Sequence, residues 1–153
     1  NFIPSEISAA FALEQVKNLK KNFSSRVKNF KYLKKFLSKY NHYFDLPIQD
    51  KFVKTCWLAF PLIIKKNNFF NRNDLQVYLE KNQIQTRVIF SGNILKQPLM
   101  RNKIYTKIKN CDIESNHVMQ NGILIGCHHG LTLKDLEYIK NTFKKFLKSK
   151  KIK

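Results

Sequence analysis

Apolar residues recur every three or four positions from Ser5 to about Tyr40, and this helical spacing constrains the fold more than any other feature. Pro4 and Ser5 are residues that commonly begin a helix. The pattern predicts one long helix, or two helices with a break near Ser24 and Ser25. A single helix of about 35 residues would extend about 50 Å, which is more than a compact domain of this size covers. We therefore expect the N-terminal part of this segment to pack against something outside the chain.

Three later stretches are rich in β-branched and aromatic residues. They predict strands at 54–64, 85–90 and 123–129. Pro61 lies inside the first of these strands and has no backbone N–H to donate. It therefore requires an edge position, a bulge or a strand end.

Helix patterns alternate with these strands, at 71–82, 113–122 and 132–147. Asn71 or Asn73 is available to cap the first helix, and Gly122 closes the second. Thr132 and Asp135 have the spacing of a capping box at the start of the third.

The order of these elements predicts an α/β or small α+β fold with about three strands packed against helices. We expect residues 1–40 to form a connecting helix from a larger protein, and residues 41–147 to form a small C-terminal domain. The segment 148–153 is expected to be a basic, solvated and frayed tail.

Composition supports a folded chain, since 43% of its residues are hydrophobic. No apolar run reaches the roughly 18 residues that would span a bilayer, and the first ten residues lack the pattern of a signal peptide. These observations predict a cytoplasmic protein with no membrane partner. The three cysteines have no CxxC spacing, which argues against a disulfide framework or a zinc finger.

The net charge of +19 is consistent with a lysine-rich module that binds nucleic acid or an anionic surface. Only four of the basic residues are arginines, and no basic run is interleaved with aromatic residues in a recognisable nucleic-acid-binding pattern. The chain is also rich in Asn, Ile and Phe, which share A/T-rich codons with Lys. Biased base composition therefore suffices to explain the charge, and we predict no nucleic-acid partner.

The sequence GCHHG at 126–130 places one thiol and two imidazoles side by side. In an extended strand Cys127 and His129 would share one face and His128 would point to the other, so the three could not hold one metal ion without a bend. No Asn or Asp stands at a recognisable spacing to orient a Cys127–His129 pair for catalysis. We expect Gly126 and Gly130 to let the chain turn sharply and present His128 or His129 at the edge of a cleft.

Three blocks of the sequence resemble the DegT/DnrJ/StrS family of PLP-dependent nucleotide-sugar aminotransferases. They are NFIPSEISAAFALEQVKNL at 1–19, QTRVIFSGNILKQPLM at 85–100, and residues 118–147. The second block, with its Gly-Asn and Gln-Pro pairs, is most similar to the 4-keto-6-deoxyhexose 3-dehydratase branch. The blocks occur in family order and span most of the chain.

The resemblance implies the C-terminal domain of a fold type I PLP-dependent transferase, acting as a homodimer with shared active sites. Its substrate would be a nucleotide-linked 4-keto-6-deoxy sugar used in lipopolysaccharide or surface-polysaccharide synthesis. The PLP lysine, or the histidine that replaces it in the dehydratases, would lie in a large domain outside this chain. We therefore expect this chain by itself to be inactive. The full-length enzyme is expected to carry PLP and, if it belongs to one subgroup of the dehydratases, an iron–sulfur cluster as well.

The same resemblance and the local chemistry select the candidate site residues. Asn1 resembles the family asparagine that reaches the PLP phosphate of the neighbouring subunit. Arg87 lies in an apolar strand setting where a guanidinium needs an anionic or carbonyl partner, which a sugar-nucleotide diphosphate would supply. Asn93 and Gln97, on a Gly/Pro loop, are candidates for substrate hydroxyl contacts, with an internal turn an equal explanation for Asn93. His128 and His129 are the remaining substrate candidates, and no metal ligands are expected.

Overall fold

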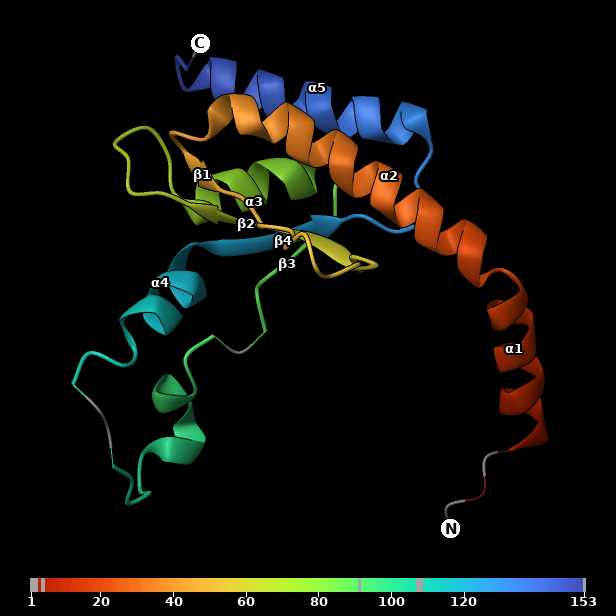
Figure 1. Cartoon of the computed structure of the whole chain (residues 1–153). Coiled ribbons are helices and arrows are strands. Elements are labelled where there is room, and N and C mark those ends of the chain that lie inside the picture. Colours follow the sequence, from red (N-terminus) through yellow and green to blue (C-terminus); the bar gives the residue numbers. More distant parts are fainter. Residues whose placement is uncertain (1–2, 4, 91, 107–108, 153) are drawn as a thin grey trace.

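The computed structural model describes residues 3, 5–90, 92–106 and 109–152 of the chain (Figure 1). It contains a four-stranded antiparallel sheet with the strand order β1-β2-β4-β3. The strands are β1 (Phe44–Asp45), β2 (Ala59–Ile64), β3 (Thr86–Arg87) and β4 (Gly122–Gly126). The α/β architecture is therefore confirmed, with one short strand, β1, that the sequence pattern did not predict.

Helices cover the sheet mainly on one face. The helices are α1 (Glu6–Lys17), α2 (Leu19–Leu37), α3 (Arg72–Lys81), α4 (Ile113–Asn121) and α5 (Leu133–Ser149), with short 3₁₀ turns η1 (Ser38–Tyr40), η2 (Ile94–Lys96) and η3 (Pro98–Met100). Figure 1 shows α2, α3 and α5 on one side of the sheet and α4 on the other. No helix among the described residues is long and apolar enough to cross a membrane.

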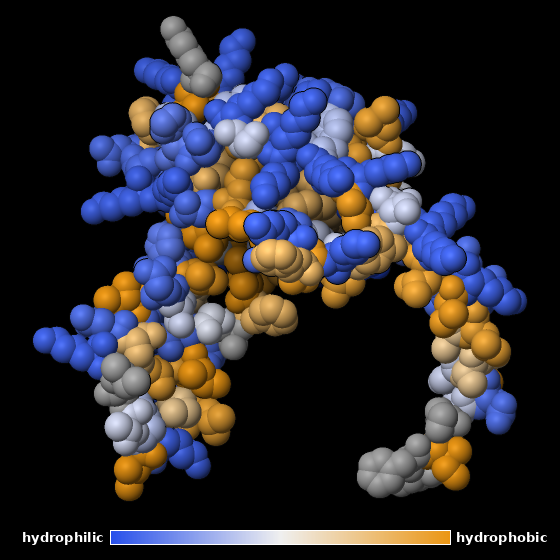
Figure 2. Space-filling view, in the orientation of Figure 1, coloured by the Kyte–Doolittle hydropathy of each residue, from blue (hydrophilic) through white to orange (hydrophobic). Residues whose placement is uncertain are grey.

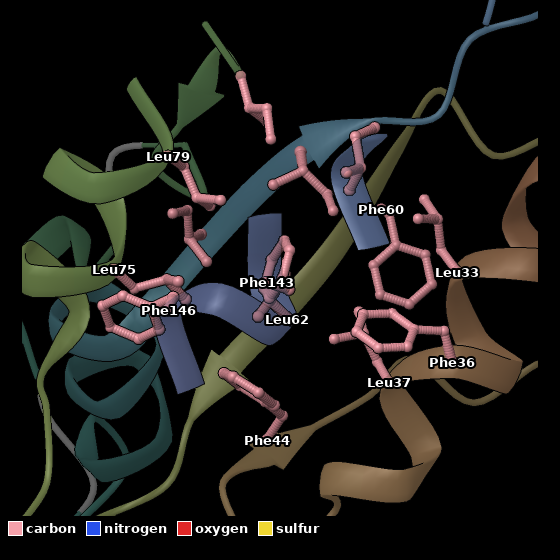
Figure 3. Packing of buried hydrophobic residues seen from close by; sticks show 14 of the residues in the cluster. Leu33, Phe36, Leu37, Phe44, Phe60, Leu62, Leu75, Leu79, Phe143 and Phe146 are labelled. Carbon is pink, nitrogen blue, oxygen red and sulfur yellow. The ribbon is translucent and has the colours of Figure 1, made fainter. Parts of the chain in front are cut away.

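The core lies between the sheet and the layer of α2, α3 and α5 (Figure 3). Phe143 of α5 is 0% exposed, and its ring centroid lies 6.3 Å from that of Phe36 and 6.4 Å from that of Phe44. Alternate residues of β2, including Phe60 and Leu62, point into this core. Aromatic rings from two helices and a strand therefore meet at the centre of the fold.

The N-terminal segment forms two helices, but the predicted break near Ser24 and Ser25 is in the wrong place. The break falls at Asn18, whose side-chain amide donates to the carbonyl of Glu14 at 3.1 Å. A side-chain bond of this kind competes with the helical backbone ladder. No residue of α1 is buried, and the helix diverges from the rest of the molecule (Figure 1).

Structural features that depend on a few neighbouring residues were predicted correctly from the sequence. Asn71 caps α3, and Thr132 forms a capping box with Asp135 at the start of α5. Pro61 lies within β2, but β1 pairs only with Ile63 and Ile64, so the missing N–H falls where β2 has no paired strand on that side.

The predicted frayed tail is wrong for its described part. Lys148 and Ser149 belong to α5, and Lys151 has a positive φ of 60°. The N–H of Ile152 donates to the carbonyl of Leu147 at 3.0 Å, and that of Lys151 donates to Lys148 at 3.0 Å. This is the Schellman arrangement, and it buries Ile152 to 6% exposure.

Replacing Phe143 with Ala should lower the free energy of unfolding by about 3–5 kcal/mol, because it removes a ring that touches two other buried rings. Urea unfolding followed by circular dichroism would measure the change. Asn141→Ala, at an exposed position of the same helix, is the control and should stay within about 0.5 kcal/mol of the parent. Similar losses for both variants would contradict the assignment of Phe143 to the core.

Candidate functional site

A cavity opens at the β3 edge of the sheet, beside the loop that joins β4 to α5. Because β3 has only two residues, the end of β4 is left without a neighbouring strand there. The cavity has a volume of about 390 Å³, and its apolar wall includes Leu124, Ile125 and Ile139. Arg87 and His128 contribute polar side chains to the same cavity, so two of the predicted site residues are brought together.

Arg87 reaches the cavity because of its register in the sheet. Thr86 pairs with Ile125 and is buried on one face of the sheet. The next residue, Arg87, therefore points to the other face, where it pairs with Leu124. Its Nη1 donates to the carbonyl of Thr86 at 2.9 Å. With the Gln85 amide turned to the orientation that satisfies both groups, its oxygen accepts from Nη2 of Arg87 at 2.7 Å.

Helix α3 holds the short strand in place. The carboxylate of Glu80 accepts from the backbone N–H of Thr86 at 2.6 Å and from its hydroxyl at 2.7 Å. The hydroxyl bond is the main reason why the pKa of Glu80 lies below its ordinary value. Glu80 is thus an ionised anchor for Thr86, and no carboxylate among the described residues forms an ion pair with Arg87. Arg87 still contributes to the lowered pKa of Glu80, and its exposed guanidinium keeps N–H donors beyond those that bond to Thr86 and Gln85.

His128 lies in the β4–α5 loop, which begins earlier than predicted. The expected strand 123–129 ends at Gly126, so the alternation proposed for Cys127, His128 and His129 does not apply. Asn29 of α2, which is buried, donates from its amide to the carbonyl of His128 at 2.8 Å. This bond fixes the loop to the helical layer.

The two glycines around His128 provide space rather than an unusual backbone conformation. Gly126 and Gly130 are not among the residues with positive φ. A Cβ atom added at Gly130 would lie 3.2 Å from Nδ1 of His128, and one at Gly126 would lie 3.6 Å from its Cδ2. The imidazole therefore lies beside both glycines. The predicted turn is present at Gly130, where the N–H of Leu131 donates to the carbonyl of His128 at 3.2 Å, and the glycines also leave room for the ring.

The Cys127 thiol is a core group. It is fully buried, and burial raises its pKa to about 11, so it is protonated at neutral pH. His129 is exposed and does not line the cavity. Among the residues that the structure describes, no group of three or more His, Cys, Asp or Glu side chains is placed to hold a metal ion.

Asn93 serves the loop between β3 and α4 rather than the cavity. It is 2% exposed, and its amide donates to Oδ1 of Asn116 at 3.0 Å and to Oδ2 of Asp112 at 3.4 Å. Its own oxygen accepts from the N–H of Leu95 at 2.9 Å. Contact between Asn93 and a substrate is therefore not supported, because both ends of the amide are engaged inside the protein. The turn explanation fits instead.

The other predicted residues lie elsewhere. Gln97 is half-buried between η2 and η3 and does not line the cavity, and Asn1 lies outside the described residues. The sequence reasoning missed Asp135 and Tyr138, which reach the cavity from α5. Their spacing with Ile139 places all three near one side of that helix. That spacing was visible in the sequence but carries no sign of a neighbouring cavity.

Comparisons with known proteins identify close relatives over nearly the whole chain. The sequence profile of the DegT/DnrJ/EryC1/StrS aminotransferase family matches residues 1–144. GDP-4-keto-6-deoxy-D-mannose 3-dehydratase of Escherichia coli O55:H7 is 31% identical over 94% of this chain and 36% of its own length. The lipopolysaccharide biosynthesis protein RfbH of Salmonella typhimurium is 29% identical over 93% of this chain and 32% of its own length.

Solved structures agree with these sequence matches. A GDP-4-keto-6-deoxymannose-3-dehydratase with a trapped PLP-glutamate geminal diamine superposes with a TM-score of 0.77 at 30% identity, covering 93% of this chain and 36% of that one. An aminotransferase from Psychrobacter cryohalolentis has a TM-score of 0.83 at 12% identity, covering 97% of this chain and 40% of its own, and it shares the fold alone. The chain thus spans about a third of the length of the curated relatives that it matches.

The Cys127 thiol should resist alkylation in the native protein. Iodoacetamide at neutral pH should modify the exposed Cys111 and leave Cys127 unmodified, because a thiol with a raised pKa is neutral and this one is buried. Peptide mapping by mass spectrometry would give both rates, and unfolding in urea should make Cys127 react as well. Equal native rates for the two thiols would show that Cys127 is an accessible nucleophile after all.

Proposed function

Because this chain belongs to the DegT/DnrJ/EryC1/StrS aminotransferase family, we propose that it forms the C-terminal part of a PLP-dependent enzyme that acts on a nucleotide-linked 4-keto-6-deoxy sugar. Several of its relatives are named for substrates of this kind. The enzyme would serve lipopolysaccharide or other surface-polysaccharide synthesis, as the name of the Salmonella relative suggests for that protein.

Of the two reactions in the family, we favour C3 deoxygenation. The relatives named as 3-dehydratases share 27% to 31% of their residues with this chain. The solved aminotransferases share 12% to 21%. The Gly-Asn and Gln-Pro pairs of the substrate-loop block point the same way. The iron–sulfur cluster of one dehydratase subgroup remains a prediction that involves no residue of this chain.

The cavity at the β3 edge is the part of this chain that we assign to the substrate. The observation that carries the assignment is the exposed guanidinium of Arg87, which lines the cavity and forms no ion pair with a described carboxylate, although Asp135 lines the same cavity. A diphosphate offers oxygens that match the planar donor fork of arginine. His128 is positioned on the same cavity to donate or accept a further hydrogen bond.

PLP itself would be held mainly by residues outside this chain. When bound, it supplies an electron sink for a carbanion that develops on the substrate. Among the described residues, no lysine lines the cavity, so this part of the chain offers no amine there for covalent attachment. Asn1 remains a proposed contact to the PLP phosphate. The homodimer with shared active sites and the cytoplasmic location also remain proposals that rest on the family resemblance.

Replacing Arg87 with Gln should raise the Kd for GDP-mannose, used as a nucleoside diphosphate sugar probe, by about tenfold or more. The variant loses charge-assisted hydrogen bonds to the diphosphate. The Kd of Arg87→Lys should lie between that of the parent chain and that of Arg87→Gln, because lysine keeps the charge but lacks the planar fork of arginine. Isothermal titration calorimetry on the protein would measure all three affinities.

Arg101→Gln is the matched control, since Arg101 is exposed and does not line the cavity. It removes the same charge and should change the Kd by less than about threefold. Equal weakening by both variants would assign the effect to net charge and contradict the placement of the diphosphate at Arg87.

The 153-residue chain produced by itself should retain no PLP absorbance after dialysis, because no lysine among the described residues lines the cavity. Absorption spectroscopy before and after dialysis would test this, with borohydride reduction and mass spectrometry to detect any covalent adduct. A stoichiometric adduct on one lysine would show that the chain carries its own cofactor site.

A further inference from the structure

The outer sides of α2 and α5 form one surface that is rich in lysine. The two helices run parallel, since Tyr32 of α2 bonds to Glu137 of α5, and Phe36 meets Phe143 further along both helices. Buried residues of each helix point to the sheet, and the opposite side carries exposed lysines. We define the basic face by Lys28, Lys31, Lys35, Lys144, Lys145 and Lys148. Figure 2 shows hydrophilic side chains across this side of the molecule.

Within the described structure the charge on the basic face is compensated only weakly, through the electrostatic attraction between Lys144 and Glu137. Helix α2 contains no acidic residue, and α5 contains none after Glu137. Glu137 is itself engaged by Lys140 at 2.7 Å and by the hydroxyl of Tyr32. None of the six lysines forms an ion pair with a described carboxylate.

The placement of these lysines carries information that their number does not. A/T-rich codons explain why the chain has many lysines, but they do not explain why several of them lie together on the outer side of α2 and α5. Large exposed apolar residues occur at places such as Ile48 and Phe52, as well as on α1 and around η2 and η3, including Phe11, Ile94 and Leu99. Helix α1 and the turns η2 and η3 lie beyond the sheet, on the side away from α2 and α5 (Figures 1 and 2). The outer side of α2 and α5 therefore combines exposed lysines with a lack of large exposed apolar groups around them, whereas the other side mixes apolar residues with exposed lysines such as Lys96 and Lys103.

We propose that the basic face binds the surface of an anionic lipid bilayer by electrostatic attraction, without inserting into it. Two parallel helices present their lysines as a broad surface, which suits a planar array of negative headgroups. The large exposed apolar residues of the two helices, Leu19, Leu133 and Tyr138, lie toward their N-terminal ends and away from the six lysines. The face therefore has charge for attraction but no apolar side chain for insertion. The opposite side, with α1, stays free for the rest of the protein.

A nucleic acid is the less suitable partner for this face. Lysine is a point charge that lacks the planar fork with which arginine reads bases and phosphates, and Arg26 of α2 is only partly exposed. Tyr32, the aromatic residue nearest to the face, bonds to Glu137, and Lys140 lies over its ring at 5.8 Å from the centroid. Its ring is therefore not open for a base to stack on it. This proposal is independent of the substrate cavity.

Co-sedimentation with vesicles would test the proposal. The full chain should bind vesicles of equimolar phosphatidylglycerol and phosphatidylcholine at low salt, should not bind phosphatidylcholine alone, and should be released as salt is raised. A variant with Lys31, Lys35, Lys144 and Lys148 replaced by Gln should bind the anionic vesicles on the order of a hundredfold more weakly.

The control variant replaces Lys54, Lys66, Lys103 and Lys109 with Gln, which removes the same charge from exposed loop positions. It should weaken vesicle binding by less than about threefold, and circular dichroism should show the parental fold for both variants. Equal loss in the two variants, or no binding of the parent chain, would overturn the proposal. Stronger dependence on the four face lysines for duplex DNA than for vesicles would reassign the face to nucleic acid.

Discussion

The parallel packing of α2 and α5 against the sheet is the interaction on which the rest of the structure depends. Phe143 joins the two helices to β1 through Phe36 and Phe44. The same contact brings Asn29 within 2.8 Å of the His128 carbonyl, so the helical layer also positions the loop at the cavity. The outer sides of the two helices are aligned by this packing as well, which gathers lysines from distant parts of the sequence into one face. Core, cavity and charged surface thus share one cause.

Helices cover one face of the sheet, but other apolar surfaces of the chain are exposed. These exposed surfaces are consistent with a chain that spans only about a third of the length of its relatives. Helices α2, α3 and α5 cover one face of the sheet, whereas α1 has no buried residue and exposes Ile7, Phe11 and Val16. Exposed apolar side chains on a helix that leaves the domain indicate a surface that is covered by something else. The relatives are about three times as long as this chain, and α1 is the element through which a preceding domain would connect.

Signals that act over a few residues predicted much of the fold. The capping boxes of α3 and α5 and the edge position of Pro61 follow from local hydrogen bonding, which a sequence expresses directly. The break at Asn18 and the buried Ile152 did not follow, because each depends on one side chain or one positive φ that competes with a regular pattern. Strand β1 has two residues and no periodicity to detect.

The candidate site shows the same division between local and tertiary information. Arg87 was selected as a candidate because a guanidinium in an apolar strand pattern needs a partner, and its register in β3 places it at the cavity. Its contact with a substrate stays a proposal. For Asn93 the turn explanation fits better, because its amide bonds to Asp112 at the N-cap of α4 and to Asn116 within α4. These partners lie about twenty residues away, and no local pattern reveals them. Tyr138 reaches the cavity only through the tertiary placement of α5.

The GCHHG segment illustrates how tertiary context assigns chemistry to residue types. The buried thiol of Cys127, with its raised pKa, is held inside the core, whereas the imidazole of His128 stands on the cavity side beside two glycines that leave room for it. Cys127 and His128 both follow the end of β4 at Gly126, but the thiol is buried in the core and the imidazole is exposed at the cavity. What the segment contributes to the proposed site is therefore one polar group, the imidazole of His128, which lines the same cavity as Arg87.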